Sequence, residues 1–418
     1  MTAAIEDAEL PRPVEQSTPP GWEPLFAPEA QQRLAVLEQA LDAGESAFAL
    51  GSKLRAEQLP GDEVAALLTQ AELRRKARSK FGTDASSMLF TQAGLEQASR
   101  AAISRRHAER YALAGLRAVA DLGCGIGSES IALLTAGVDV MAVELDPFTA
   151  RVAEHNLASA AQQAGSANAR VFVEDAQRVS LDRVDGAFLD PARRTAGHRN
   201  TRRLTNPDDY SPSLGFAFGL AERMPTGVKL GPGFDRELLP EAAEAQWVSI
   251  DGQLVETGIW FGALARQGVA RSALVLRGDE AFELSAASDS EDVECQALGE
   301  YLYEPDGAVI RARLIGLLAE QLDAGMVSEG IAYLSADALT PTPFAQTFRV
   351  LEQLPSSEKQ LKRALSARGI GKLEIKKRGA DVDPAALRTR LRLKGPNSAT
   401  LFLTRVAGKH AALLAERV

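Results

Sequence analysis

Four carboxylates stand at the ends of short apolar runs, and they are the residues of this chain with the clearest capacity for chemistry. Each run has the length and composition of a buried strand. A carboxylate fixed at a strand end offers two acceptor oxygens to a ligand. The residues and the runs before them are Asp121 after 116–120, Glu144 after 139–143, Asp175 after 170–173 and Asp190 after 186–189.

Three glycines at every second position follow the first acid. Gly123, Gly125 and Gly127 separate Asp121 from a helical pattern that begins near Ser130. Strand, glycine turn and helix together are typical of a nucleotide-binding α/β unit, in which the backbone must approach its ligand closely. The spacing differs from G-x-G-x-x-G, which serves a pyrophosphate. An acid two residues before the first glycine favours a cationic ligand without phosphate.

The elements that would position these residues alternate between strand and helix over 113–284. Further strand candidates lie at 227–230, 247–250, 252–256 and 273–276. This alternation predicts an α/β fold with a mostly parallel sheet. Trp260 and Phe261 follow one of these candidates. They could stack on a base, although core packing is the commoner role of such aromatics.

An α-helical domain is expected over 28–112, after a disordered acidic, proline-rich leader at 1–27. Helical spacing is clear at 30–43 and 64–80, and a third helix leads from Phe90 into the glycine motif. The basic stretches 74–80 and 100–110 could contact a polyanion or could be ordinary helix surface.

The end of the chain is basic although the whole protein is acidic. Residues 341–418 carry 16 Lys and Arg against 6 Asp and Glu, whereas the net charge of the protein is −9. This segment alternates strands and helices, and it follows a polar stretch at 285–292 and a connecting α/β segment at 293–340 with a helix at 309–324. An acidic body with a basic module indicates an enzyme that binds nucleic acid.

Composition excludes several classes of protein. Two cysteines do not make a disulfide framework and fit a reducing compartment, so we expect a cytoplasmic protein. No cysteine and histidine pair has the spacing of metal ligands, so no metal is expected. No apolar run approaches the roughly 20 residues of a membrane helix, and the N-terminus resembles neither a signal nor a transit peptide.

Taken together, the chain resembles bacterial class I S-adenosylmethionine-dependent methyltransferases that carry a C-terminal THUMP-like domain. The motifs that carry the resemblance are VADLGCGIG, the acids Glu144 and Asp175, FLDPARR, VKLGPG and the basic module at 341–418. The resemblance implies a Rossmann-like, seven-stranded methyltransferase sheet and S-adenosyl-L-methionine as cofactor. In such enzymes the residues that bind the cofactor would correspond to Asp121, Gly123, Gly125, Gly127, Glu144, Asp175 and Asp190.

The same resemblance implies roles for individual acids. Asp121 would orient the methionine part, Glu144 the ribose and Asp175 the adenine amine. Asp190, Pro191 and Ala192 correspond to the acceptor motif of enzymes that methylate amino groups of nucleic acids. Ala192 replaces the second proline of that motif, and Arg193 replaces its aromatic residue.

The sequence D-P-A-R is also similar to the motif of RNA 5-methyluridine methyltransferases, which use a cysteine nucleophile. No cysteine lies between Cys124 and Cys295, so covalent attack is disfavoured. THUMP domains occur in RNA-modifying enzymes, chiefly those of tRNA. We therefore expect methylation of a base nitrogen in RNA, either tRNA or rRNA. A loop between two strands would hold substrate phosphate, or would form ion pairs with the acidic body, through Arg193, Arg194, Arg199, Arg202 and Arg203.

Two alternatives remain open at this point. The chain could methylate a small molecule or a protein, with the basic module serving another purpose. It could also be a non-catalytic RNA-binding protein that keeps the cofactor fold, because the D-P-A-R motif departs from the usual form. The sequence sets no expectation for the oligomeric state.

Overall fold

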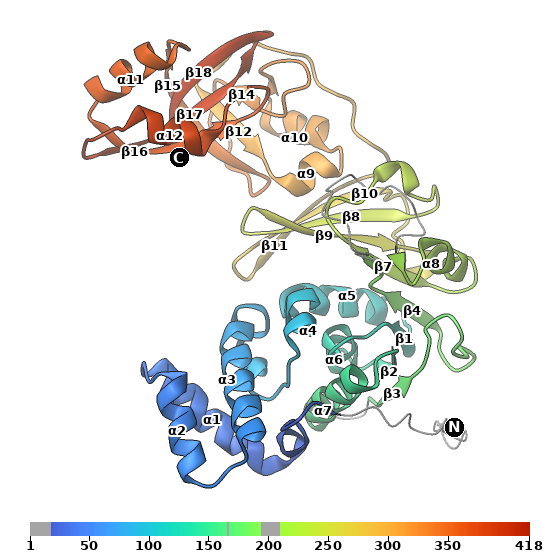
Figure 1. Ribbon diagram of the computed structural model, residues 1–418. Helices are drawn as coiled ribbons and strands as arrows, with labels where there is room; N and C mark the ends of the chain where they lie inside the picture. Colours follow the sequence, from blue (N-terminus) through green and yellow to red (C-terminus); the bar gives the residue numbers. More distant parts are fainter. Residues whose placement is uncertain (1–17, 165–166, 194–209) are drawn as a thin grey trace. The chain divides into compact units, whose positions relative to one another are not determined.

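The computed structural model describes residues 18–164, 167–193 and 210–418. The chain forms two compact units. The first comprises Met1–Lys229 with Phe261–Leu264, and the second comprises Leu230–Trp260 with Ala265–Val418. Each unit is described by itself below, and Figure 1 gives the element labels.

The first unit begins with helices. They are η1 Glu23–Phe26, α1 Pro28–Asp42, α2 Ala47–Ala56, α3 Gly61–Phe81, η2 Gly82–Ser86, α4 Gln92–Gln97 and α5 Ala101–Leu113. The helices expected at 30–43 and 64–80 are confirmed as α1 and α3. The expected third helix is two helices, because Ala98 and Arg100 have extended backbones. The sequence analysis missed α2, which begins at Ser46, whose hydroxyl accepts a hydrogen bond from Ala49 N.

The leader is in part ordered, contrary to expectation. Leu25 is fully buried, and the ring of Trp22 meets that of Phe148 edge to face at 4.8 Å. The carboxylate of Glu23 pairs with Arg151. These contacts explain why the chain is fixed from about Trp22 onward, although its composition resembles a linker. Residues 1–17 lie outside the described part.

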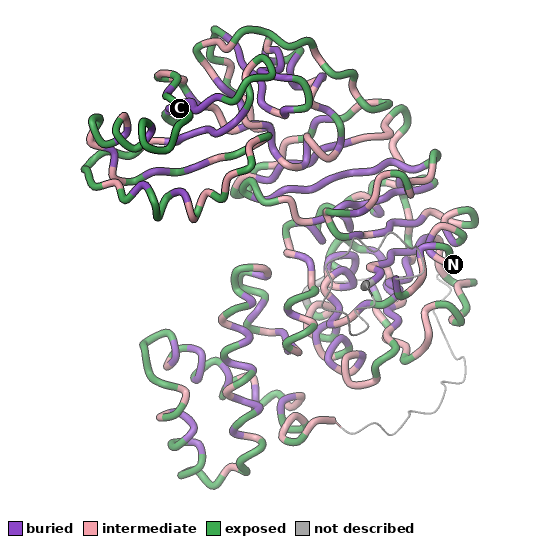
Figure 2. The backbone as a smooth tube through the Cα atoms, turned by 45° about the horizontal axis from the view of Figure 1, so that its top comes forward, coloured by how far each residue is buried: buried purple, intermediate pink, exposed green. Residues whose placement is uncertain are grey.

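The basic stretch of α3 has one buried cation and two partly exposed cations that pair with α1. Arg74 is fully buried, and its Nε donates to the carbonyl of Met88 at 2.8 Å. Arg75 pairs with Asp42 at 2.7 Å, and Arg78 pairs with Glu38 at 2.8 Å. These cations therefore link α3 to α1, which favours a structural role over contact with a polyanion. Buried and exposed positions alternate along these helices in Figure 2, at the lower left of the view.

A parallel sheet follows the helices. Its strands in the first unit are β1 Ala118–Leu122, β2 Asp139–Glu144, β3 Ala169–Val173, β4 Gly186–Leu189 and β7 Thr226–Leu230, in the order β7-β4-β1-β2-β3. Every pairing between these neighbours is parallel. The connections include α6 Ser128–Thr135, α7 Pro147–Ala164 and α8 Leu214–Ala221. Tyr111 of α5 supports the sheet, since its hydroxyl donates to Ala187 O at 2.6 Å and accepts from Gly227 N at 3.0 Å.

The second unit contributes four strands to the large sheet. They are β8 Glu244–Ile250, β9 Gln253–Trp260, β10 Arg271–Arg277 and β11 Glu280–Ala286. The sheet thus has nine strands and not the expected seven. The additional hairpin of β10 and β11 was not expected as a pair, because β11 has no strong alternation. Strand β9 runs antiparallel to β8, and β11 runs antiparallel to β10. The sheet otherwise agrees with the expected α/β class.

A second sheet of seven strands completes this unit. Its strands are β12 Tyr301–Pro305, β13 Gly325–Met326, β14 Leu334–Ala336, β15 Ala345–Leu354, β16 Ile370–Lys377, β17 Asn397–Val406 and β18 Lys409–Arg417. Their order is β13-β14-β12-β15-β18-β17-β16, so strands from 293–340 and from 341–418 share one sheet. Its helices are α9 Gly307–Arg311, α10 Ile315–Leu322, α11 Glu358–Ala367 and α12 Pro384–Leu391.

One expectation for this region was wrong, and one strand was missed. The single helix at 309–324 is divided into α9 and α10, because Arg313 has a φ of 59° in the left-handed region. The sequence analysis also missed β18, which follows β17 through a turn at Ala407 and Gly408 with φ of 46° and 77°. That turn matches the twist of a hairpin, but its residues are not the usual Asn-Gly or Asp-Gly signal.

Asn156 of α7 yields a prediction about stability. Its side chain is buried, donates to Leu89 O at 3.0 Å and Ile126 O at 2.9 Å, and accepts from Leu89 N at 2.7 Å. Asn156→Ala leaves these backbone groups without partners and should lower the free energy of unfolding by about 2–4 kcal/mol. Urea denaturation followed by circular dichroism measures this loss.

The matched control for that experiment is Gln162→Ala, an exposed position on the same helix. Its effect should stay within about 0.5 kcal/mol. Equal midpoints for the two variants would contradict the role given to Asn156.

Candidate active site

The four expected acids lie at the carboxyl ends of β1 to β4. Asp121 lies within β1, Glu144 ends β2, and Asp175 and Asp190 follow β3 and β4. Because these strands are parallel neighbours, their carboxyl ends share one edge of the sheet. The structure therefore gathers residues that the sequence separates widely.

The glycine turn has the conformation that its sequence predicts. Gly123, Gly125 and Gly127 have φ of 89°, 56° and 87°, which L-residues with side chains rarely adopt. Among the described residues, apart from the chain neighbours of each glycine, no atom lies within 4 Å of the place where a Cβ would stand on Gly123 or Gly125. At Gly127 that place lies 3.6 Å from the Cβ of Ala153. The first two glycines thus border open space, whereas the third allows α6 to approach α7.

The carboxylate of Glu144 is fixed by backbone donors. Its Oε2 accepts from Gly125 N at 3.0 Å, and its Oε1 accepts from Asp146 N at 2.9 Å. Each oxygen keeps a second lone pair that a ribose hydroxyl can use. Asp175 is held less firmly, by Gln177 N at 2.9 Å and by Arg178 at 3.8 Å. Open space beside the glycines and this fixed carboxylate fits the adenosyl cofactor that the resemblance implies.

Asp121 is the most buried of the four acids. It is 2% exposed, and its Oδ2 accepts from Ser130 Oγ at 2.6 Å. Burial raises the pKa of Asp121 to about 7, and the charges of Glu129 and Asp190 act in the same direction against the Ser130 hydrogen bond. This carboxyl therefore changes its charge near neutral pH, where a cation beside it would favour the ionised form.

Asp190 forms an ion pair that the sequence analysis did not foresee. Its Oδ2 pairs with Nζ of Lys229 on β7, and Nζ also donates to Ser99 Oγ at 3.0 Å. The side chain of Asp190 is 34% exposed, so the carboxylate reaches the surface of the unit. A signal existed in the sequence, since Lys229 is the one charged residue in the strand TGVKL before Gly-Pro-Gly.

A short strand begins two residues after Asp190. Pro191 is buried, and Ala192–Arg193 form β5, which pairs antiparallel with β6 Tyr210–Ser211. The backbone of Arg193 thus lies directly beyond the acceptor motif. The remaining arginines expected to hold phosphate, Arg194, Arg199, Arg202 and Arg203, lie outside the described residues.

A buried polar cluster lies behind the glycine turn. Glu129 of α6 accepts from Ser104 Oγ at 2.9 Å and lies 3.3 Å from Nδ1 of His107, both on α5. Burial alone would raise the pKa of Glu129, but His107 and Lys229 outweigh it and hold this pKa below its usual value. This cluster was also missed, because no local pattern joins α5 to α6.

Other candidate groups do not join the site. Cys124 is buried, and burial together with the charges of Asp121 and Glu144 raises the pKa of its thiol well above the usual value. A thiolate is therefore disfavoured there, as expected, and Cys295 is exposed in the second unit. Trp260 and Phe261 are 1% and 6% exposed, which agrees with core packing and not with base stacking.

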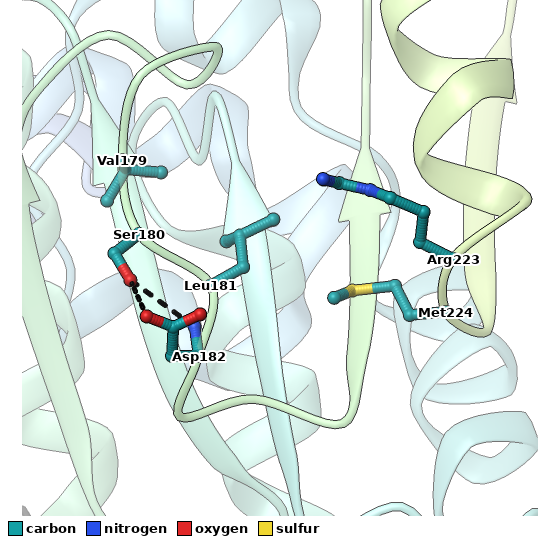
Figure 3. A pocket seen from close by; sticks show the side chains of 6 residues that line it. All are labelled: Val179, Ser180, Leu181, Asp182, Arg223 and Met224. Carbon is teal, nitrogen blue, oxygen red and sulfur yellow. Dashed lines mark hydrogen bonds between the residues drawn. The ribbon is translucent and has the colours of Figure 1, made fainter.

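A shallow pocket lies away from these acids. Figure 3 shows its lining, where the segment before β4 faces the segment before β7. The lining residues are Val179, Ser180, Leu181, Asp182, Arg223 and Met224. The amino ends of parallel strands lie opposite the edge that carries Asp121 and Asp190, so this pocket is not part of the site.

The described residues contain neither a cluster of metal ligands nor a membrane-spanning helix. No three His, Cys, Asp or Glu side chains in that part of the chain are grouped so as to hold a metal ion. Within the same residues, no helix has both the length and the apolar character needed to span a membrane.

Comparison with known proteins gives the family. Residues 345–417 match the THUMP domain-like family, and residues 20–77 match a domain of unknown function. An uncharacterized S-adenosylmethionine-dependent methyltransferase of Mycobacterium tuberculosis, in two strains, is 35% identical over 356 residues, which is 83% of this chain and 94% of the relative.

A solved structure supports the fold. The putative methyltransferase from Porphyromonas gingivalis W83 superimposes with a TM-score of 0.73 at 22% identity, over 92% of this chain and 98% of that chain. The expected α/β methyltransferase fold with its THUMP-like domain is therefore confirmed, and the cofactor is S-adenosylmethionine. The chain belongs to the S-adenosylmethionine-dependent methyltransferases.

Proposed function

We propose that this enzyme transfers a methyl group to a base nitrogen of RNA, in tRNA or rRNA, and that it acts in the cytoplasm. The observation that carries the proposal is the carboxylate of Asp190, which is partly exposed at the end of β4 and paired with Lys229. It lies at the same sheet edge as Asp121 and Glu144. An ionised carboxylate in that place is an acceptor for a target amino group.

The acceptor residues would act by positioning. S-adenosylmethionine, when bound, supplies a methyl group on a cationic sulfur. Asp190 accepts a hydrogen bond from the target amino group, and the carbonyl groups of Pro191 and Ala192 are the candidates for a second. This arrangement aims the nitrogen lone pair at the methyl carbon. The N–C bond forms as the S–C bond breaks with its electron pair left on sulfur, and Asp190 can take the proton that nitrogen releases.

The cofactor would be held by the residues around the glycine turn. Gly123 and Gly125 give it space, and Gly127 allows the approach of α6. Asp121 faces the methionine ammonium group, Glu144 binds the ribose hydroxyls, and Asp175 accepts from the adenine amine. Asp190 closes the site on the side of the acceptor.

The basic module supports RNA as the acceptor. In this proposal residues 28–112 form a helical domain, 113–284 the catalytic domain and 341–418 the RNA-binding module. The segment 293–340, expected as a connection, contributes strands to the sheet of that module. Several exposed cations of the module make no ion pair with any described residue, namely Lys362, Arg363, Lys372, Lys377 and Lys394. They and the Arg193, Arg194, Arg199, Arg202 and Arg203 segment would hold phosphates, while the target base is flipped from its stack.

The proposal predicts transfer of labelled methyl to RNA. Purified enzyme and labelled S-adenosylmethionine should label total RNA from cells that lack this enzyme, and nucleoside analysis should identify a base methylated on nitrogen. Ribonuclease treatment should remove the label, and higher salt should weaken the reaction because phosphate contacts release counterions. Label that survives in a protein or small-molecule fraction would overturn the choice of RNA.

The role of Asp190 predicts a separation of binding from transfer. Asp190→Ala should abolish methyl transfer, whereas the affinity for S-adenosyl-L-homocysteine in calorimetry should change less than about fivefold. Asp182→Ala, an exposed acid before β4, is the control and should keep full activity. Equal losses of binding and transfer in Asp190→Ala would indicate a structural role.

The position of Asp121 predicts a pH dependence of cofactor binding. Its pKa in the protein is about 7, so the carboxyl is neutral below that pH and ionised above it. The ligand's ammonium group stays charged up to about pH 7.7–8.0. Affinity for S-adenosyl-L-homocysteine should therefore rise from pH 5.5 to 7.5. Asp121→Asn, which keeps the shape of the side chain, should bind weakly and remove this dependence; a flat profile in the parent enzyme would refute it.

A further inference from the structure

Lys229 is an unusual residue for an interior strand. It is the one charged side chain of β7, its side chain is 11% exposed, and both neighbours Val228 and Leu230 are buried. Burial of an ammonium group costs free energy unless partners compensate it. Its partners include the carboxylate of Asp190 and the hydroxyl of Ser99.

Ser99 comes from the helical region of the same unit, and its own position is fixed. It is 7% exposed and lies between α4 and α5. The ammonium of Lys80 on α3 donates to the carbonyls just before it, those of Leu95, Glu96 and Ala98, at 2.7, 2.9 and 2.9 Å. These carbonyls end α4, where a cation is favourable.

The contacts form a continuous chain from α3 to the acceptor site. Lys80 holds the segment that ends at Ser99, Ser99 holds Lys229, and Lys229 pairs with Asp190. We propose that Lys229, held by Ser99, is the positioning residue that fixes the rotamer and the negative charge of Asp190 for methyl transfer. This inference rests on the acceptor role proposed for Asp190, and it gives the helical region a part in building the site.

The need for a cation follows from the neighbouring strands. β1 and β4 pair in parallel with Leu122 opposite Leu189, so Asp121 and Asp190 occupy adjacent strand ends. The two carboxylates carry like charges, the charge of Asp190 raises the pKa of Asp121, and repulsion of this kind favours the neutral form of each. A neutral Asp190 would offer one acceptor oxygen fewer to the amino group. Lys229 opposes that outcome by favouring the charged form.

Other charged groups near the pair of Lys229 and Asp190 can also affect the pH profile. Glu129 and His107 lie behind the glycine turn, and the charge of Lys229 reaches Glu129. Glu144 faces the turn from β2, and the charges of Arg100 and Lys80 act from the helical side. Substitutions at Lys229 and Asp190 leave all of these groups in place, so a difference between variants reports on the pair itself.

The experiment measures cofactor binding, which needs no acceptor. S-adenosyl-L-homocysteine affinity is recorded from pH 5.5 to 7.5 for the parent enzyme, Lys229→Met, Asp190→Asn and the double variant. The loss of Lys229 removes a positive charge from the neighbourhood of Asp190 and Asp121, so the midpoint of the profile should rise by about one pH unit. Asp190→Asn should lower the midpoint, and the double variant should resemble Asp190→Asn.

Activity provides the second readout. At saturating cofactor, Lys229→Met should lower kcat about 100-fold, because misplacement of a positioning group such as the Asp190 carboxylate has an effect of that size. Lys229→Arg should keep the charge and the midpoint while losing part of kcat, and Ser99→Ala should lower kcat about threefold to tenfold. Lys76→Met, an exposed lysine of α3, is the matched control.

The outcomes separate the two proposals. An unchanged midpoint in a folded Lys229→Met variant, with parent-like kcat, would overturn the role given to Lys229. The same midpoint in the parent enzyme, the single variants and the double variant would also overturn that role, even if transfer to RNA is never found. Absence of RNA methylation by the parent enzyme, with the expected shifts of the midpoint, would refute the RNA proposal and keep the role of Lys229.

Discussion

Repulsion among acids at one edge of a parallel sheet is the physical constraint on which this site depends. The fold places Asp121, Glu144, Asp175 and Asp190 at the ends of neighbouring strands, and their negative charges oppose one another. Three of these acids have different forms of compensation. Glu144 accepts from backbone donors, Asp121 from a serine, and Asp190 from a lysine. Asp121 is also the most buried of them, and burial raises its pKa to about 7.

The helical region supplies much of this compensation. Ser104 and His107 of α5 bind Glu129 next to the glycine turn, and Ser99 binds Lys229. Asn156 of α7 joins the segment before α4 to the turn itself. Ion pairs also join two further helices of this region, α1 and α3. The helices are therefore part of the catalytic unit's interior and not an appendage to it.

Local patterns were sufficient to find the strands, the glycine turn and the strand-end acids. Each of these depends on neighbours in sequence, such as an apolar run followed by Asp121 or alternate glycines with positive φ. The ion pair of Lys229 and Asp190 could not be predicted from local patterns, because only the pairing of β4 with β7 brings these residues together. The same limit applies to Glu129 and His107. Some backbone conformations could not be predicted either, because no local pattern marks the left-handed Arg313 that divides α9 from α10.

The two cysteines have a practical consequence. Cys124 lies in the glycine turn, buried and with a raised pKa, whereas Cys295 is exposed. The thiolate is the nucleophile that attacks a thiol reagent, so such reagents discriminate strongly between two such groups. A maleimide dye at neutral pH would therefore mark the second unit alone and leave the cofactor turn chemically untouched. The natural chain thus carries a single-site attachment point for fluorescence, at a residue remote in sequence from every acid of the site.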